Sequence, residues 1–255
     1  MIAFTSDIDW APEQVIRDTI RLFEEFEVRC TFFATHSSTE IHNCNKEFFE
    51  VAIHPNFNPL IEGKGGDADR VLDEILSIYP DAKGVRSHSM TQSTNLLAKF
   101  ADRNLLYDAN HFLPYYNSVQ PFRLWNGMIR IPYNWEDDIH CMYGFSFEDS
   151  KIDIVDGYLN VLDFHPIHIF LNTESLERYN AAKKYYQEPH KLLEYRNTKK
   201  KGARDLLIDL LECVQANEIE TKTLTEISEE FIRKEQFNEN RWPFIGTGFG
   251  SQNKP

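Results

Sequence analysis

The sequence predicts an α/β fold in which a parallel sheet closes into a distorted barrel of seven or eight βα units. Short apolar runs alternate with helix-like stretches over most of the 255 residues. The opening run has no polar face, as expected of a buried parallel strand, and it ends abruptly in acidic residues. Seven or eight such units in one chain favour a (β/α) barrel, with the reactive side chains at one rim.

The expected strands are short, and most of them end where polar residues begin. They lie at 2–6, 30–34, 49–53, 83–86, 105–107, 128–132, 158–164 and 220–223. The carboxyl ends of parallel strands meet at one edge of a sheet or barrel, so the residues that follow them are expected to lie together.

The expected helices repeat apolar residues at near-helical spacing, beginning with the stretch from Pro12 to Phe26. Further helices are expected at 67–79, 93–103, 175–187 and 201–217, and a last one begins at a capping box formed by Thr223 and Glu226. No linker rich in glycine, proline or serine interrupts residues 1–235, which predicts a single catalytic barrel. Residues 236–255, with Trp242 and Phe244, are expected to be disordered or packed on the domain.

Composition and charge argue against several classes of function. The formal net charge is −13, which argues against sequence-independent binding to nucleic acid or to anionic membranes, because both need basic surfaces. No apolar stretch approaches the roughly 20 residues of a membrane span. The four cysteines show no C-x-x-C spacing, and the chain opens directly with strand sequence rather than a signal peptide. We therefore expect a reducing, cytoplasmic setting.

The first strand ends in two closely spaced carboxylates, Asp7 and Asp9. If the strand continues through Asp9, both side chains lie on the same side. Two carboxylates this close repel each other, so they need a cation, a shared proton or a neighbouring arginine. The alternative is that Asp9 caps the helix that starts near Pro12.

Other strand ends carry residues that suit such a site. His54 ends the third strand, Arg86 and His88 end the fourth, and His165 and His168 follow a late strand. An arbitrary histidine is more often a hydrogen-bonded loop residue than a ligand, but several independent strand ends bearing Asp, His and Arg favour a site. Aspartate with two or more histidines suits a divalent ion, most often zinc.

The order of these motifs resembles the polysaccharide deacetylase (NodB homology, carbohydrate esterase family 4-like) family. The motifs are Thr5-x-Asp7-x-Asp9, a strand ending in His54-Pro55, Gly84-x-Arg86, Arg130-x-Pro132-x-x-Trp135 and Phe164-His165-Pro166. Each motif is short, and their order and spacing over about residues 1–235 make the match specific. The resemblance implies a distorted barrel of the NodB type in an intracellular glycan-biosynthesis branch of the family.

The resemblance also implies roles for individual residues. Asp7 matches the catalytic base, and Arg86 matches the arginine that positions this base. Asp9 and His54 match metal ligands, and His165 matches the general acid. Trp135 is expected, by loose analogy, to form a wall of the sugar pocket. Apart from the resemblance, Trp10, Asn110 and Tyr133 are expected to contact substrate, and a capped polar loop is the commoner interpretation of Asn110. For the aromatic residues, apolar packing is an equally good interpretation.

The sequence departs from the family pattern at Asn58, where the family has its second ligand histidine. A carboxamide oxygen is a weaker ligand for a borderline ion than imidazole. Three outcomes stay open: Asn58 completes the ligand set, His88 or His168 replaces the missing imidazole, or the metal site is degraded.

The leading functional hypothesis is a metal-dependent hydrolase that removes an N-acetyl group from a sugar or glycan precursor, such as a nucleotide- or lipid-linked sugar. One alternative is a metal-independent amide hydrolase of the same fold. Another is a catalytically silent carbohydrate-binding protein. Metal analysis separates the first from the others, and substrate identity depends on loop shape that a sequence does not reveal.

Overall fold

The computed structural model describes residues 1–148, 150, 152 and 158–236. Its strands are β1 (Ile2–Asp7), β2 (Cys30–Ala34), β3 (Phe49–Ile53), β4 (Gly84–Val85), β5 (Tyr107–Asp108), β6 (Phe122–Arg123), β7 (Ile129–Arg130), β8 (Trp135–Glu136) and β9 (Asn160–Asp163). They form one sheet in the order β6-β7-β5-β4-β3-β2-β1-β9-β8. All neighbouring strands are parallel except β6 and β7, so the predicted parallel sheet is in fact mixed at one edge.

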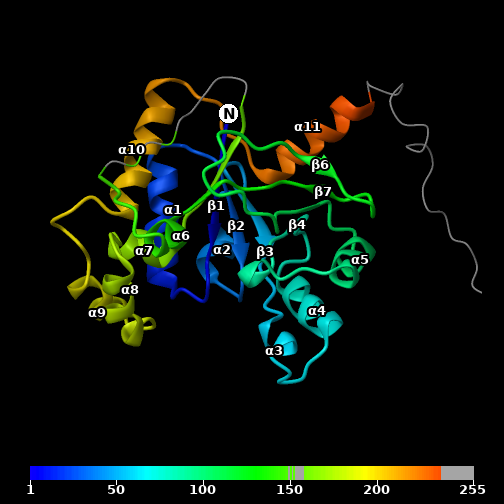
Figure 1. Cartoon of the computed structure of the whole chain (residues 1–255), viewed down its shortest axis with the longest axis horizontal. Coiled ribbons are helices and arrows are strands. Elements are labelled where there is room, and N and C mark those ends of the chain that lie inside the picture. The colour runs from blue at the N-terminus through cyan, green and yellow to red at the C-terminus, as the bar shows by residue number, and fades with distance from the viewer. Residues whose placement is uncertain (149, 151, 153–157, 237–255) are drawn as a thin grey trace, which may run out of the picture.

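Helices surround this sheet (Figure 1). They are α1 (Glu13–Glu25), α2 (Thr39–Asn43), α3 (Asn58–Ile61), α4 (Ala68–Ile78), α5 (Thr94–Asp102), α6 (Asp137–Met142), α7 (Pro166–Leu171), α8 (Leu176–Ala182), α9 (Pro189–Glu194), α10 (Ala203–Ala216) and α11 (Leu224–Gln236), with 3₁₀ turns η1 (His88–Met90) and η2 (Lys183–Tyr185). None of the described helices has the length and apolar character needed to cross a membrane.

The sheet curls until its two ends meet along one short segment, residues 131–134. This segment joins β7, which pairs with β5, directly to β8, which pairs with β9. The Ile131 amide donates to the Asp108 carbonyl at 2.9 Å, and the Asn134 amide donates to the Val161 carbonyl at 3.0 Å. The chain thus passes from one end of the sheet to the other within a few residues. The prediction of a distorted barrel is confirmed.

Some predicted elements have the predicted bounds, and others are shortened or divided. The predicted strands at 30–34 and 49–53 have the predicted bounds. The strand predicted at 220–223 is reduced to one bridge between Ile2 and Thr221, because only the end of β1 is available to it. The helix predicted at 175–187 is divided into α8 and η2.

The last helix, α11, packs near the amino ends of the strands, opposite the end to which their arrows point (Figure 1). Its predicted capping box is present: the Thr223 amide donates to Glu226 at 2.8 Å, and the Glu226 amide donates to the Thr223 hydroxyl at 3.4 Å. The tail predicted at 236–255, with its Trp242 and Phe244, lies outside the described residues apart from the end of α11.

Two apolar layers fix the barrel. Inside it lie Ala3, Phe33, Ala52, Tyr107, Ile129 and Val161. Between sheet and helices lie Phe4, Phe32, Ile53 and Leu162 together with the apolar faces of α1, α7 and α10. Side chains alternate along each strand, so Thr5 and Asp163, which pair in register on β1 and β9, share the inner side. The inner layer therefore leads directly to polar groups at the carboxyl ends.

Candidate active site

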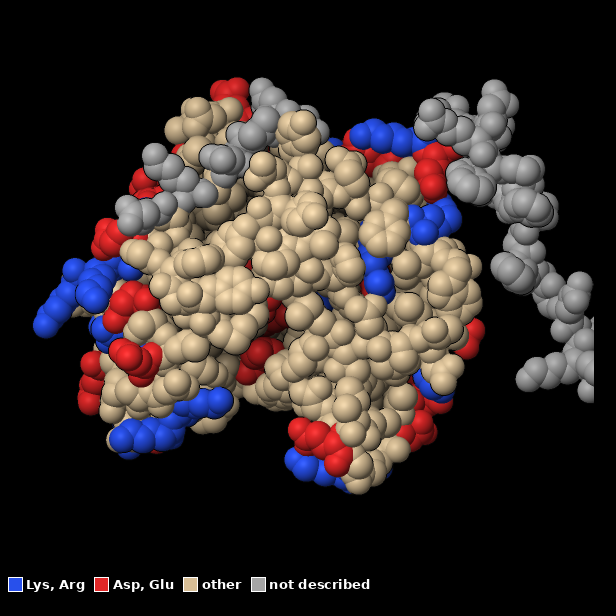
Figure 2. Space-filling view, in the orientation of Figure 1, with Lys and Arg blue, Asp and Glu red and all other residues tan. Residues whose placement is uncertain are grey.

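The carboxyl ends of the strands surround a small polar pocket of about 90 Å³. Figure 2 shows acidic side chains at the bottom of a hollow between the lobe of α7, α8 and α9 and the lobe of α3 and α4. The lining residues are Asp7, Asp9, His54, Arg86, Ser87, His88, Ser89, Met90, Tyr133, Glu136, Asp138 and His165. The structure thus brings together six of the residues that the sequence placed at strand ends.

The turn after β1 carries Asp9 in an unusual backbone conformation. Strand β1 ends at Asp7, and both Asp9 (φ 37°) and Trp10 (φ 56°) are left-handed. The hydroxyl of Tyr186 donates to the Asp9 carbonyl at 2.7 Å and helps to hold this turn. Helix α1 has Pro12 at its N-cap and no side-chain cap, so the alternative in which Asp9 caps the helix is wrong.

Three potential ligand atoms form a nearly equilateral triangle. Asp9 Oδ1 lies 3.3 Å from His54 Nε2 and 3.2 Å from His88 Nδ1, and the two nitrogens lie 3.3 Å apart. Donor atoms about 2.0–2.1 Å from a tetrahedral zinc ion stand roughly 3.3 Å from one another. The spacing of the triangle therefore fits a divalent ion.

The chemistry of these groups fits an ion as well. Asp9 Oδ1 is buried and has no hydrogen-bond partner among the described residues. Burial alone raises the pKa of Asp9, but the imidazoles of His54 and His88 outweigh it and hold this pKa well below its usual range. The other nitrogen of His54, Nδ1, lies 3.6 Å from Asp7 Oδ2, so the ring stands between the two carboxylates of the β1 turn.

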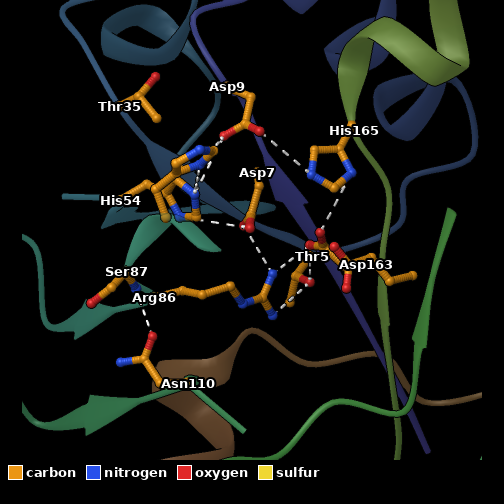
Figure 3. A network of polar contacts seen from close by, with 12 residues as sticks. Thr5, Asp7, Asp9, Thr35, His54, Arg86, Ser87, Asn110, Asp163 and His165 are labelled. Atoms are coloured by element: carbon orange, nitrogen blue, oxygen red, sulfur yellow. Dashed lines mark hydrogen bonds and ion pairs between the residues drawn. The ribbon is translucent and has the colours of Figure 1, made fainter. Parts of the chain in front are cut away.

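Asp7 belongs to a buried ion network built on Arg86 (Figure 3). Arg86 Nη1 lies 2.8 Å from Asp7 Oδ1 and 2.5 Å from Asp163 Oδ1, and Arg86 Nη2 donates to the Thr5 hydroxyl at 3.1 Å. The Thr5 hydroxyl in turn donates to Asp163 Oδ1 at 2.6 Å. One guanidinium thus forms ion pairs with two carboxylates that are almost fully buried.

Aromatic rings hold the Arg86 guanidinium on both sides. Its central carbon lies 4.3 Å from the ring centre of Phe33 and 4.3 Å from that of Tyr133. Burial lowers the pKa of Arg86, but the carboxylates of Asp163 and Asp7 outweigh it, so this arginine stays charged. Burial raises the pKa of Asp7 to about 6, and the charge of Arg86 opposes that shift. A carboxylate of this kind suits a general base near neutral pH.

His165 is held by the carboxylate of Asp137. Asp137 Oδ1 lies 2.7 Å from His165 Nδ1, and Asp137 Oδ2 accepts the His165 amide at 2.9 Å. Asp137 is fully buried. Burial lowers the pKa of His165, but the charge and hydrogen bond of Asp137 outweigh it and raise this pKa well above its usual value. The other nitrogen, Nε2, faces Asp9 Oδ2 at 3.7 Å.

Two further carboxyl groups line the pocket beside His165. Glu136 accepts a hydrogen bond from the Tyr133 hydroxyl at 3.2 Å. Burial and the neighbouring Asp138 raise the pKa of Glu136 well above its usual value. Both residues flank Asp137 in sequence but face the pocket rather than the buried ring nitrogen. Sequence reasoning missed Glu136, Asp163 and the role of Asp137, although Asp163 precedes His165 by two residues, on the same side of β9.

Some predicted site residues lie elsewhere. Asn58 bonds to the loop after β4 rather than to the triangle. His168 is buried, with Nδ1 3.0 Å from the Thr173 hydroxyl, and is outside the clusters that fit an ion among the described residues. Asn110 is fully buried and does not line the pocket. Trp135 packs against Phe164 on the outer face of the barrel and lines a different cavity.

Two predicted contact residues do lie at the pocket or beside it. Tyr133 lines it and covers Arg86. Trp10 is 38% exposed and meets the His88 ring edge-on, with ring centres 5.0 Å apart. Trp10 does not line the pocket itself but lies against one of its lining residues, His88.

The curled barrel thus carries a buried Asp–Arg–Asp network beside an Asp–His–His triangle. The profile of the WbmS-like polysaccharide deacetylase family matches residues 4–183, and the chain belongs to this family. It is a carbohydrate deacetylase that acts on C–N amide bonds.

Solved structures agree with this assignment. A putative polysaccharide deacetylase involved in O-antigen biosynthesis from Bordetella bronchiseptica is 43% identical, with a TM-score of 0.78 over 83% of this chain and 90% of that one. A putative polysaccharide deacetylase from Mycobacterium smegmatis has the same fold, with a TM-score of 0.52 and 16% identity over 92% of this chain and 90% of that one. No curated protein matched the sequence.

Proposed function

We propose that this protein is a zinc-dependent N-deacetylase that removes the acetyl group from an N-acetylated sugar of a glycan precursor, such as a nucleotide- or lipid-linked sugar. The observation that carries the proposal is the triangle of Asp9 Oδ1, His54 Nε2 and His88 Nδ1, with edges of 3.2–3.3 Å. The similarity to a protein named for O-antigen biosynthesis supports a glycan precursor as substrate.

In this proposal Asp9, His54 and His88 hold the ion, and His88 replaces the histidine that the family pattern places at Asn58. One carboxylate and two imidazoles are a ligand set that zinc accepts. A bound divalent ion acts as a Lewis acid on the amide carbonyl and makes a water molecule more acidic.

Asp7 is the proposed general base. Its Oδ1 is fixed by Arg86, and Oδ2 lies 3.6 Å from Nδ1 of His54, the ring whose other nitrogen is a corner of the triangle. With a pKa of about 6, Asp7 is ionised at neutral pH and accepts the proton of the attacking water. Arg86 and Asp163 hold it in place before substrate arrives, which is the kind of preorganisation that electrostatic catalysis requires.

His165 is the proposed general acid. Asp137 accepts the Nδ1 proton of His165, and in the doubly protonated ring Nε2 also carries a proton, which faces the pocket 3.7 Å from Asp9 Oδ2. The raised pKa keeps this ring protonated at neutral pH, and it donates its proton to the departing amine nitrogen. Trp10 and Tyr133 are the proposed contacts to the sugar at the rim and the wall of the pocket.

The test is acetate release from a panel of free and UDP-linked N-acetylhexosamines, measured with zinc-loaded and chelator-treated enzyme. We expect release only with the loaded enzyme, and about one zinc ion per chain by elemental analysis. Undiminished release after complete metal removal would support a metal-independent amide hydrolase. Sugar binding without acetate release would support a carbohydrate-binding protein. The cytoplasmic location and the lack of nucleic-acid partners stay predictions.

A further inference from the structure

The loop that follows β4 carries His88 and has a strained backbone. Ser89 (φ 55°) and Met90 (φ 51°) are both left-handed, directly after His88. Each such residue costs about 1–3 kcal/mol and persists only where its surroundings hold it. The loop from Ser87 to Gln92 therefore needs contacts that fix it, and those contacts also decide where the His88 ring lies.

Asn58 holds this loop from the side of α3. Its Nδ2 donates to the Ser89 hydroxyl at 3.1 Å, and its Oδ1 accepts from the Thr91 hydroxyl at 3.3 Å. Both ends of the carboxamide are thus used on residues one and three positions after His88. Because both its donor and its acceptor are hydrogen-bonded to this loop, the Asn58 side chain supports the loop rather than binding an ion.

Asn110, which follows β5, holds the same loop by a second set of contacts (Figure 3). Its Oδ1 accepts the Ser87 amide at 2.7 Å, and its own carbonyl accepts Gln92 Nε2 at 2.8 Å. These contacts fix the residue that lies between Arg86 and His88, and the end of the loop as well.

Asn110 is itself oriented by a buried ion pair. Its Nδ2 donates to Asp108 Oδ2 at 3.2 Å, and Arg130 binds both Asp108 oxygens at 2.7 and 2.6 Å. The amide group of Asn110 therefore has one orientation, with its oxygen toward Ser87. This chain of contacts ties the loop to strands β5 and β7, which do not contribute to the triangle themselves.

We propose that Asn58 and Asn110 are positioning residues that hold His88 in the triangle with Asp9 and His54. Asn58 stands where the family pattern has a histidine, and in this chain it supports the loop that supplies His88 instead. This inference rests on the proposed function, in which the triangle binds a divalent ion.

The test is a double-mutant cycle on cobalt affinity, measured by visible absorption and calorimetry with the full chain. N110A is expected to weaken cobalt binding about 10–100-fold, in the range found for residues that orient metal ligands. N58A is expected to weaken it about tenfold, because Asn58 is only half-buried and acts on one side of the loop. In the H88A background, neither substitution is expected to weaken binding further.

Asn134 supplies a matched control. It is also a buried asparagine whose Oδ1 accepts a strand amide, that of Val161 at 2.9 Å, and whose Nδ2 donates to the Tyr116 carbonyl at 2.6 Å. It does not line the catalytic pocket. N134A should lower the unfolding temperature without weakening cobalt binding, which separates positioning of His88 from general loss of structure.

Each outcome has a defined meaning. If N58A weakens binding by the same factor with and without His88, Asn58 acts independently of His88 and the inference fails for it. If N110A affects affinity no more than N134A, the inference fails for Asn110. If H88A leaves cobalt affinity unchanged, the proposed ligand set fails instead. Should N110A not fold, N58A at its half-buried position carries the same cycle.

Discussion

The two halves of the catalytic pocket are built differently. In the half that contains Asp7, the carboxylates are paired with Arg86 at 2.8 and 2.5 Å, and His165 is paired with Asp137 at 2.7 Å. In the half that contains Asp9, the polar atoms stand 3.2–3.3 Å apart, and Asp9 Oδ1 lacks a hydrogen-bond partner among the described residues.

The backbone shows the same difference. Thr5, Asp7 and Asp163 belong to strands that pair in register, whereas Asp9 lies in a left-handed turn and His88 directly precedes two left-handed residues. The comparison teaches that the base, Asp7, is fixed by the barrel strands and its ion pair with Arg86. The acid, His165, is fixed by Asp137 at the start of α6. Asp9 and His88 lie on loops, and we expect the ion to complete that half.

The largest loss of activity is expected when the proposed base, Asp7, is replaced. D7N keeps a similar shape but removes the carboxylate that accepts the proton, so kcat should fall by about 10³–10⁴. Zinc content should stay at the wild-type level, because Asp7 lies outside the triangle. Loss of zinc together with activity would make Asp7 a ligand and would contradict the division into two halves.

Replacing Arg86, the cation shared by Asp7 and Asp163, should lower the stability of the fold rather than metal binding. R86M leaves Asp7 and Asp163 buried without their partner, so we expect the free energy of unfolding to fall by about 3–5 kcal/mol. Urea unfolding of the metal-free protein measures this change. The comparison variant is H88A, which should change the metal-free value by less than about 1 kcal/mol. Equal losses in both variants would mean that the halves do not differ in this way.

The general acid offers a test by pH. Activity requires protonated His165, so activity is lost as pH rises through the pKa that Asp137 raises. D137N removes the charge that raises it, so the basic limb of the kcat profile should move to lower pH. The maximal rate should fall by about 10² as well. An unchanged basic limb would show that another group sets it.

The smallest expected effect is the increase in thermal stability when zinc binds. Zinc at 100 times its dissociation constant should stabilise the wild-type protein by about 2.7 kcal/mol, because it binds only the folded chain. D7N should gain the same amount, whereas H88A should gain much less at the same zinc concentration. Calorimetric scans with and without zinc measure these differences.

Much of this site was predictable from where strands end. Asp7, His54 and Arg86 follow short apolar runs, and parallel strands bring such residues to one rim whatever the helices between them do. Two features were not predictable, because they depend on loop conformations that no periodicity encodes. One is the position of Asp9 within the turn. The other is that His88, rather than Asn58 or His168, is the third member of the triangle.

The predicted positions of other residues were wrong for a different reason. Trp135 lies on the outer face because the chain changes partners at residues 131–134, where it passes from β5 to β9. The closure of the barrel, rather than the local pattern, decides which face of β8 turns inward. Asp137, which directly follows β8, is buried against His165.

The central claim is that Asp9, His54 and His88 bind the ion. A crystal structure of the zinc-loaded protein, with anomalous scattering measured on both sides of the zinc edge, tests it most directly. The account predicts one anomalous peak about 2.0–2.2 Å from Asp9 Oδ1, His54 Nε2 and His88 Nδ1, with Asn58 still bonded to Ser89. A peak coordinated by Asn58 or His168, or a peak that His88 does not touch, would contradict it.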